Sequence, residues 1–324
     1  MTRPALLVDG VGRDYADKKN VVTALSEVSF RVGPGEVVGL LGINGAGKTT
    51  LLRIIATLLT PTRGRVLVDG VDVEADPRAA RRHLSVVFGG DRGLYPRLSA
   101  LDNALLFGSL GGVPTRDLEK SARGALTSVG LLDVAGRPVN TFSKGMKQRL
   151  HLAVGLMARP SLVMLDEPTV GVDPLETERL RSAVAKLPGE GIGVLLTSHN
   201  LQDIERLASR VVMLRDGRVT HDLPLHDLVE QNGGGTVVTV LSSEPCPIAA
   251  GTAQASGIRV LAGAYTPEDG VWRTEFEVAE WTAGSLRALA EWWPPGAVKD
   301  VRVQPVGLEQ VFGRLAGATA GESR

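Results

Sequence analysis

The sequence predicts an α/β domain followed by a smaller α+β domain. In the first two-thirds of the chain, short apolar runs such as "GEVVGLL", "PSLVMLDEP" and "GIGVLLTSH" stand between Gly, Pro or polar residues. Such runs are typical of strands that are buried on both faces of a parallel sheet. Helical patterns follow them, and strands that alternate with helices indicate a three-layer α/β domain.

The pattern changes after three consecutive glycines, Gly233 to Gly235. Beyond them, "TVVTVL", "VWRTEFEVA" and "AVKDVRV" predict strands, and "GSLRALAEW" and "GLEQVFGRLAG" predict helices. All four tryptophans lie in this part, where we expect them to fill a small core, the alternative being an aromatic ligand site. The expected division is a first domain at residues 1–228, a linker at 229–236 and a second domain at 237–324.

Composition limits the classes of function. Lys and Arg number 36, as do Asp and Glu, so the formal net charge is zero and nucleic acid is disfavoured as the main partner. A single cysteine, Cys246, excludes an internal disulfide and fits a reducing compartment. No stretch approaches the roughly 18 apolar residues of a membrane span, and the N-terminus lacks the apolar core of a secretory signal. We therefore expect a cytosolic chain, or one that reaches a membrane only through a partner.

The segment "GINGAGKT" matches the pattern G-x-x-x-x-G-K-[ST], between an apolar run and the helical stretch "TLLRIIATLL". Its glycines let successive N–H groups point at phosphate oxygens, so the context predicts a nucleotide-binding loop. Lys48 is expected to neutralise the β- and γ-phosphates, and the Thr49 hydroxyl to bind Mg²⁺. The alternative is a glycine-rich turn with an exposed lysine. The expected nucleotide contacts here are Gly42, Asn44, Gly45, Ala46, Gly47, Lys48, Thr49 and Thr50.

Two acidic residues follow the apolar run of "LVMLDEP". Ligands of open α/β sheets bind at the carboxyl ends of the strands. Asp166 is thus predicted to hold Mg²⁺, directly or through water, and Glu167 to act as the general base that polarises an attacking water. A helix-capping role is disfavoured because the pair precedes Pro168 at the end of a buried strand. His199 ends another strand, in "LLTSHN", and is expected to contact the γ-phosphate.

The segment "FSKGMKQRL" predicts a helix that begins among cationic side chains. Ser143 is placed to cap it, and Met146, Leu150 and Met157 fall on one helical face. A helix N-terminus offers unpaired N–H groups and a partial positive charge, which suit an anion. The pattern alone does not say to which molecule that anion belongs.

In their order and spacing, "GINGAGKTT", "FSKGMKQRL", "LVMLDEPTVGVDP" and "TSHN" resemble the motifs of ATP-binding-cassette ATPases. The resemblance covers residues 5 to about 225. It implies a P-loop NTPase cassette with a helical subdomain at about 90–160, and ATP and Mg²⁺ as cofactors. It also implies that Ser143 and Gly145 contact the γ-phosphate of ATP held by Lys48 of a second subunit. The partner would be a second copy or a related subunit.

Further residues take roles from the same resemblance. Tyr15 looks like the aromatic residue that stacks on adenine, and Asp173 resembles the loop that crosses between subunits. "SKGMK" replaces the commoner Ser-Gly-Gly-Gln run, as in exporter ATPases. Gly90 stands where the family usually has a glutamine that contacts Mg²⁺ or water. We expect hydrolysis to persist with less dependence on that loop.

The resemblance favours the ATPase subunit of an exporter for drugs, lipids or polysaccharides. The ending "VGLEQVFGRLAG" is similar to that of the daunorubicin-resistance branch, with Gln310 in place of Asp. The expected partner is a multi-spanning membrane permease, which would hold the chain at the cytoplasmic face of the cell membrane. One alternative is a soluble ATPase clamp that acts on nucleic acid or ribosomes. Another is a weakly hydrolysing regulatory subunit, for which Gly90 is the only support.

Overall fold

The structure is a computed structural model. Its chain forms two compact units, Met1–Leu225 and His226–Arg324, which are described separately. None of the helices in the described part of the chain is long and apolar enough to cross a membrane. The described residues are 3–17, 20–89, 93–232, 235–248, 257–266 and 270–317.

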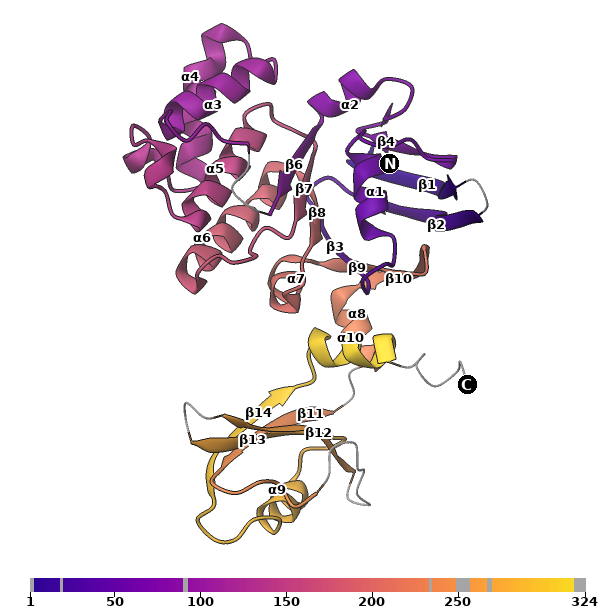
Figure 1. The fold of residues 1–324 in the computed structure, drawn as a ribbon, viewed down its shortest axis with the longest axis vertical. Helices are drawn as coiled ribbons and strands as arrows, with labels where there is room; N and C mark the ends of the chain where they lie inside the picture. Colours follow the sequence, from indigo (N-terminus) through magenta and orange to yellow (C-terminus); the bar gives the residue numbers. More distant parts are fainter. Residues whose placement is uncertain are drawn as a thin grey trace. The chain divides into compact units, whose positions relative to one another are not determined.

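A six-stranded sheet forms the centre of the first unit (Figure 1). Its order is β10 (Arg218–Pro224), β9 (Arg210–Arg215), β3 (Val37–Leu41), β8 (Gly193–Thr197), β7 (Leu162–Asp166) and β6 (Leu84–Phe88). The strands run parallel except β10, which pairs antiparallel with β9 at the edge. All residues of β3 and β8 are buried, which explains their uninterrupted apolar sequences. The three predicted buried strands are therefore confirmed.

A second sheet in this unit was not predicted. It is antiparallel, with the order β2 (Asn20–Val32), β1 (Leu6–Asp17), β4 (Arg63–Val68) and β5 (Val71–Asp72). Its strands place alternate residues such as Leu6 and Val8 in the core, so each shows a period of two that the search for continuous apolar runs missed. Helix α1 (Lys48–Ile55) contributes Leu51 and Ile54 to a core shared with strands of both sheets. The start of α1 is thereby fixed between the two sheets.

Helices α3, α4 and α5 pack against one another and form the expected helical part of the cassette (Figure 1). Helix α5 also packs against β6 and α6, which connects this helical part to the central sheet. The helices of the first unit are α1, α2 (Pro77–Arg82), α3 (Ala100–Leu110), α4 (Thr115–Ser128), α5 (Lys144–Leu156), α6 (Pro174–Val184) and α7 (Leu201–Leu207). Short 3-10 turns cover Leu132–Val134, Val139–Thr141 and Leu187–Glu190.

The second unit contains an antiparallel sheet of order β12-β13-β11-β14. Phe276 lies at its core, with the rings of Trp292 and Trp293 at centroid distances of 5.4 and 5.8 Å. Trp281 packs on the same core, so three of the four tryptophans fill it as expected, whereas the Trp272 ring packs against Tyr265 at a centroid distance of 5.4 Å. The elements are α8 (Leu225–Asn232), β11 (Thr236–Ser242), β12 (Ile258–Thr266), β13 (Val271–Val278), α9 (Ala283–Ala290), β14 (Val298–Pro305) and α10 (Leu308–Gly317).

Two details of this unit differ from the sequence prediction. Helix α8 continues to Asn232, so the linker expected at 229–236 begins later than predicted. Leu228 is fully buried, and this packing stabilises a helix that the glycine pattern did not indicate. Strand β12 was also missed, because its small and polar residues around Gly263 give no clear alternation. Gly233 and Gly234 lie outside the described residues.

Candidate functional site

The loop between β3 and α1 contains glycines at positions that disfavour any side chain, through backbone conformation, close packing or both. Gly45 and Gly47 have φ values of 84° and 101°, in the left-handed region. A Cβ on Gly42 would lie 2.4 Å from the carbonyl oxygen of Leu214, and one on Gly47 would lie 2.6 Å from that of Ala24. The loop therefore leads directly into the first turn of α1, whose N–H groups have no partners within the helix and suit an anion.

Lys48 lies at this loop and points its ammonium group back over it. Its Nζ donates to the carbonyl oxygens of Gly42 and, at 3.3 Å, Ile43. Burial lowers the pKa of Lys48, while Glu167 and Asp166 act in the opposite direction. The predicted lysine and the two predicted carboxylates are thus brought together at one edge of the central sheet.

The two carboxylates are held by the neighbouring strand. Asp166 and Thr197 are directly opposite in the β7–β8 pairing, and Thr197 Oγ1 donates to Asp166 Oδ1 at 2.6 Å. The N–H of Glu167 donates to the Thr197 carbonyl oxygen at 3.1 Å. Thr197 was missed by the sequence analysis, although its place beside His199 at a strand end could have indicated it. The Asp166 carboxylate and the Thr49 hydroxyl are hard oxygen donors, which fit Mg²⁺.

Glu167 adopts a backbone conformation that is unusual for a side chain of its size. Its φ is 54°, in the left-handed region, and such strain is often found at functional sites. Its Oε2 accepts from the His199 N–H at 2.8 Å, and its Oε1 lies 3.6 Å from His199 Nε2. The imidazole is largely exposed, which leaves it open to a bound anion.

Tyr15 lies beside the same helix start. Its hydroxyl is 3.5 Å from Thr50 Oγ1, and the guanidinium carbon of Arg13 lies 4.9 Å from the ring centroid. The ring is 39% exposed. Strand β1 therefore places a partly exposed aromatic ring next to the phosphate loop, with the Arg13 guanidinium over the ring, and the adenine contact stays a prediction.

A second group of predicted residues surrounds the start of α5. Ser143 Oγ accepts from the Met146 N–H at 3.1 Å, so Ser143 caps the helix as predicted. A Cβ on Gly145 would lie 2.3 Å from the Cβ of Glu176, and this close packing requires glycine. Asp173 caps α6 by accepting from the Glu176 N–H at 3.0 Å. Glu176 thus contacts both Gly145 and Asp173, and Ser143 and Asp173 are exposed.

A buried ion pair stiffens this second group. The Arg149 Nη2 donates to Glu176 Oε2 at 2.7 Å, and both side chains are almost fully buried. Arg149 also donates to the carbonyl oxygen of Val129 at 2.8 Å. Among the described residues, no hydrogen bond or ion pair joins Ser143 or Gly145 to Lys48. The two groups are therefore distinct within one chain.

One residue that the sequence analysis missed connects the two groups indirectly. Asp203 is fully buried and accepts from Thr169 Oγ1 at 2.5 Å, Ser198 Oγ at 2.7 Å and Arg181 Nε at 2.8 Å. Thr169 follows Glu167 closely, Ser198 precedes His199, and Arg181 lies on α6, which Asp173 caps. A hollow of about 640 Å³ next to these segments is bordered by His199 and Pro174.

The position of the expected glutamine loop is only partly visible. Gly90, with Asp91 and Arg92, lies outside the described residues. The preceding Gly89 donates its N–H to the Asp166 carbonyl oxygen at 2.7 Å. A Cβ there would lie 2.5 Å from the carbonyl oxygen of Glu167, so the chain passes very close to the carboxylates at this point.

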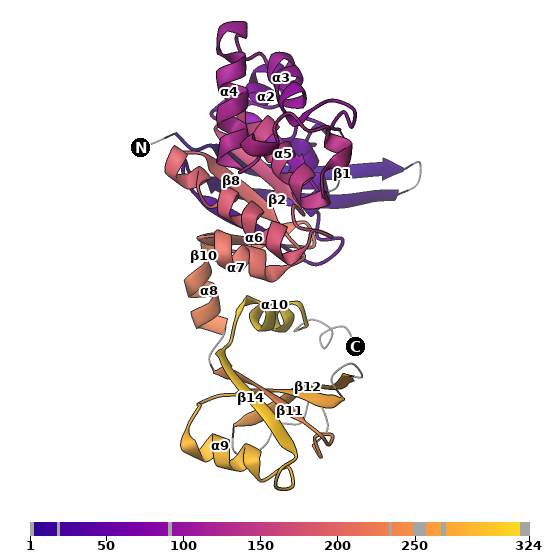
Figure 2. The ribbon, with the colours of Figure 1, turned by 90° about the vertical axis from the view of Figure 1, so that its left-hand side faces the viewer.

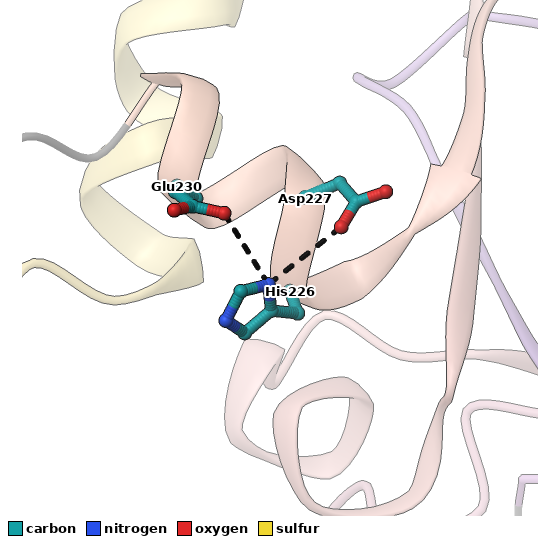
Figure 3. Close-up of side chains that lie close together, drawn as sticks. All are labelled: His226, Asp227 and Glu230. Atoms are coloured by element: carbon teal, nitrogen blue, oxygen red, sulfur yellow. Dashed lines mark ion pairs between the residues drawn. The ribbon is translucent and has the colours of Figure 1, made fainter.

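Helix α8 carries a separate set of possible metal ligands, His226, Asp227 and Glu230 (Figure 3). The His226 Nδ1 lies 3.6 Å from Asp227 Oδ1 and 3.5 Å from Glu230 Oε2. All three side chains are largely open to solvent and come from one helix turn. This arrangement is that of ordinary helix-surface ion pairs, and we assign it no metal.

Comparison with known sequences finds similarity to one family. The profile of the family described as "ABC transporter" matches residues 25–170. The ABC transporter ATP-binding protein NatA of Bacillus subtilis is 38% identical over 218 residues, covering 67% of this chain and 89% of NatA. The daunorubicin resistance ATP-binding protein DrrA3 of Streptomyces coeruleorubidus is 37% identical over 74% of this chain and 75% of its own. The linearmycin resistance ATP-binding protein LnrL of Bacillus subtilis is 29% identical over 97% of this chain and 99% of its own.

Solved structures give the same result for the first unit. An ATP-binding subunit of an ABC transporter superimposes with a TM-score of 0.61 at 30% identity, over 70% of this chain and 92% of its own. The cassette MJ0796, in a dimeric post-hydrolysis state bound to ADP and Pi, gives a TM-score of 0.58 at 26% identity. That similarity covers 68% of this chain and 98% of MJ0796.

Proposed function

The chain belongs to the ATP-binding-cassette transporter ATPases, and from this membership we propose that two copies close over two ATP molecules to drive a separate membrane exporter. The family binds nucleotide and hydrolyses ATP, so the chain is an ATPase. The observation that carries the proposal is the separation of its predicted contacts into two groups. One group surrounds Lys48, and the other surrounds Ser143.

Each group supplies half of what ATP hydrolysis requires. Lys48 neutralises the β- and γ-phosphates, and the first N–H groups of α1 bind the same anion. Asp166 and the Thr49 hydroxyl would hold Mg²⁺, which would supply neutralisation of the phosphate charge. Glu167 orients and polarises the attacking water, and His199 contacts the γ-phosphate. Tyr15 stacks on the adenine.

The second group completes the site of another copy. Ser143 is exposed at the N-terminus of α5, and its backbone and that of Gly145 present N–H groups without helical partners. Gly145 packs on α6, and Ser143 is exposed and, among the described residues, has no hydrogen bond or ion pair with the phosphate loop of its own chain, so Ser143 and the start of α5 are available to the ATP of a partner. A two-fold symmetric dimer forms two such composite sites, with Asp173 near the crossing point. A related subunit could replace the second copy.

The work of hydrolysis is transmitted to a multi-spanning permease, which holds the chain at the cytoplasmic face of the membrane. The names of the relatives support this proposal, since they include daunorubicin resistance ATP-binding proteins and a Nod factor export ATP-binding protein. A drug, lipid or polysaccharide is the expected class of cargo. Purification from gently solubilised membranes should recover a stoichiometric membrane protein, and recovery of the chain alone would contradict the exporter assignment.

A mixing experiment tests the composite site. Lys48→Met removes the phosphate contact, and Ser143→Asp places a negative charge toward the γ-phosphate while it keeps a good helix cap. Each variant alone should lack ATPase activity. Mixed in equal amounts they should recover roughly a quarter of the wild-type activity, because half of the dimers are mixed and each of these holds one intact site.

The control is Ser143→Asn, which caps the helix without adding charge and should retain most of the activity when assayed alone. A mixture of Lys48→Met and Ser143→Asp that stays inactive, with both variants folded, would show that both groups act within one chain.

A further inference from the structure

Strand β14 forms an open edge of the second unit's sheet (Figure 2). Within the described residues it pairs with β11 alone, and every residue after Val298 in it is exposed. Val301 and Val303 are 38% and 43% exposed, although natural edge strands usually avoid such apolar side chains. Pro305 and a register shift between the pairs of Asp300 and Val298 delimit the open segment. It is thus a short, defined template for another strand.

The two faces of β14 differ. Val301 lies opposite Val240 of β11, and Val303 lies opposite Val238, both of which are buried in the core. Opposite residues in a ladder share one face, so these valines extend the core face beyond the sheet edge. A groove of about 290 Å³ adjoins Val301 and is lined by Leu286 of α9 and Pro294 among others. Leu286 is 48% exposed, so the apolar surface continues onto the helix.

The other face of the same segment is charged. Asp300 and Arg302 lie on it, and the Arg302 Nε donates to Asp300 Oδ2 at 3.0 Å. An acidic and a basic residue therefore stand two positions apart, with Val301 between them on the opposite face. In an antiparallel pair of two such segments centred on Val301, the acidic residue of each copy would lie opposite the basic residue of the other.

We propose that β14 pairs with β14 of a second copy of this chain, antiparallel and centred on Val301. A symmetric antiparallel pair must centre on a residue, because opposite residues share one face of the sheet. Centring on Asp300 or Arg302 would place like charges opposite each other. Centring on Val301 places Asp300 opposite Arg302 of the partner subunit, twice, and brings the two Val301 side chains together.

The pairing joins two four-stranded sheets into one continuous sheet. Both α9 helices then lie on the same face, and the two apolar grooves meet at the junction. So small an interface is weak by itself, but it acts at high effective concentration when two chains share one permease. It does not depend on ATP, so it would hold two copies together between rounds of hydrolysis.

Cysteine crosslinking tests the register. In a Cys246→Ser background, which removes the only native cysteine, Val301→Cys should form a covalent dimer on mild oxidation without nucleotide. Val303→Cys is the matched control, since Val303 is slightly more exposed on the same face but lies opposite Lys299 of the partner subunit. Equal crosslinking of both variants, or none at Val301, would overturn the proposal.

Charge exchange tests the contact without cysteine chemistry. Arg302→Asp places two acidic pairs opposite each other and should weaken self-association, measured by sedimentation without nucleotide, by about fivefold or more. Adding Asp300→Arg restores both opposite pairs and should restore the wild-type association. The same series in the Lys48→Met background separates this contact from ATP-driven dimerisation. A wild-type chain that stays monomeric at the highest concentration measured, or a double variant that associates as weakly as the single one, would refute the pairing.

Discussion

The group of residues around Lys48 (the phosphate-loop group) and the group around Ser143 and Gly145 (the signature group) differ in how tightly they are packed. Around Lys48 the backbone is also close-packed at Gly42 and Gly47, but the side chains are exposed or half-exposed and Glu167 has a left-handed φ of 54°. Around Gly145 the backbone is close-packed on α6, and a buried Arg149–Glu176 pair holds that packing. The first group is therefore suited to adapt to nucleotide, and the second to present a rigid helix N-terminus to a partner.

The hydrogen-bond network around Asp203 connects the phosphate-loop group to the signature group. Its partners come from the segments beside Glu167 and His199 and from α6. One buried carboxylate thus joins the segments beside Glu167 and His199 to α6. Coupling between the two groups requires a physical connection between two arrangements, and this network is the connection that the structure offers.

The largest effect on turnover is expected at Glu167 of the phosphate-loop group. Glu167→Gln keeps the shape of the side chain but removes the general base, so turnover should fall by about 10²- to 10⁴-fold. ATP binding should persist, because the loop and Lys48 are unchanged. Phosphate release and sedimentation with ATP measure the two effects, and a persistent dimer is expected.

Glu190→Gln, at an exposed glutamate of a 3-10 turn, is the control for that experiment and should behave as wild type. A Glu167→Gln chain that remained monomeric with ATP would contradict the division into two half-sites.

A smaller effect on turnover is expected at Asp203, which connects the phosphate-loop group to the signature group. Asp203→Asn leaves Arg181 buried with a weakened partner, so the free energy of unfolding should fall by about 2–3 kcal/mol. Arg181 keeps its 2.6 Å contact with Glu178, which places the loss at the low end for a buried pair. Chemical denaturation measures it, and turnover should fall about tenfold through misplaced Glu167 and His199.

Two readouts separate this role from simple destabilisation. ATP affinity of the monomer should change little, since Lys48 has no contact with Asp203 among the described residues. Glu178→Gln, which removes the exposed member of the network, should lose less than about 1 kcal/mol. Equal losses in both variants would mean that Asp203 has no special position between the groups.

The sequence could predict residues that a local pattern identifies, but not those that depend on partners distant in the chain. That Asp166, Glu167 and His199 lie at one edge could be predicted because each ends or follows a continuous apolar strand, and parallel strands bring their carboxyl ends together; Lys48 was predicted from its glycine-rich loop. Ser143 was found because a cap must lie next to its helix in sequence. Asp203 and Arg149 were not found, because their partners are distant in sequence and no local pattern indicates a buried ion pair. The antiparallel β1–β2 sheet was missed because half-buried, alternating strands give a weaker signal than fully buried ones, and β12 lacks even a clear alternation.

The smallest effect is expected from the charge of Lys48, which is half-buried in the phosphate-loop group when no ligand is bound. Burial holds the pKa of Lys48 below its ordinary value of 10.5, so the folded chain binds this proton less tightly than the unfolded chain. Below both pKa values the charge therefore reduces stability, and the reduction disappears as the pH rises through the folded value toward the unfolded one. Without nucleotide, Lys48→Met should be slightly more stable than wild type at neutral pH, by less than about 1 kcal/mol because solvent screens a half-exposed group.

Thermal unfolding measured at several pH values tests this sign. The difference between Lys48→Met and wild type should shrink as the pH approaches 10.5, and the exposed Lys186→Met variant should follow wild type throughout. Adding ATP should reverse the order at neutral pH, since ligand stabilises only the chain that binds it. A Lys48→Met chain less stable than wild type at every pH would mean that the contacts of Lys48 with Gly42 and Ile43 outweigh the burial of its charge. The phosphate-loop group would then be as firmly built as the signature group.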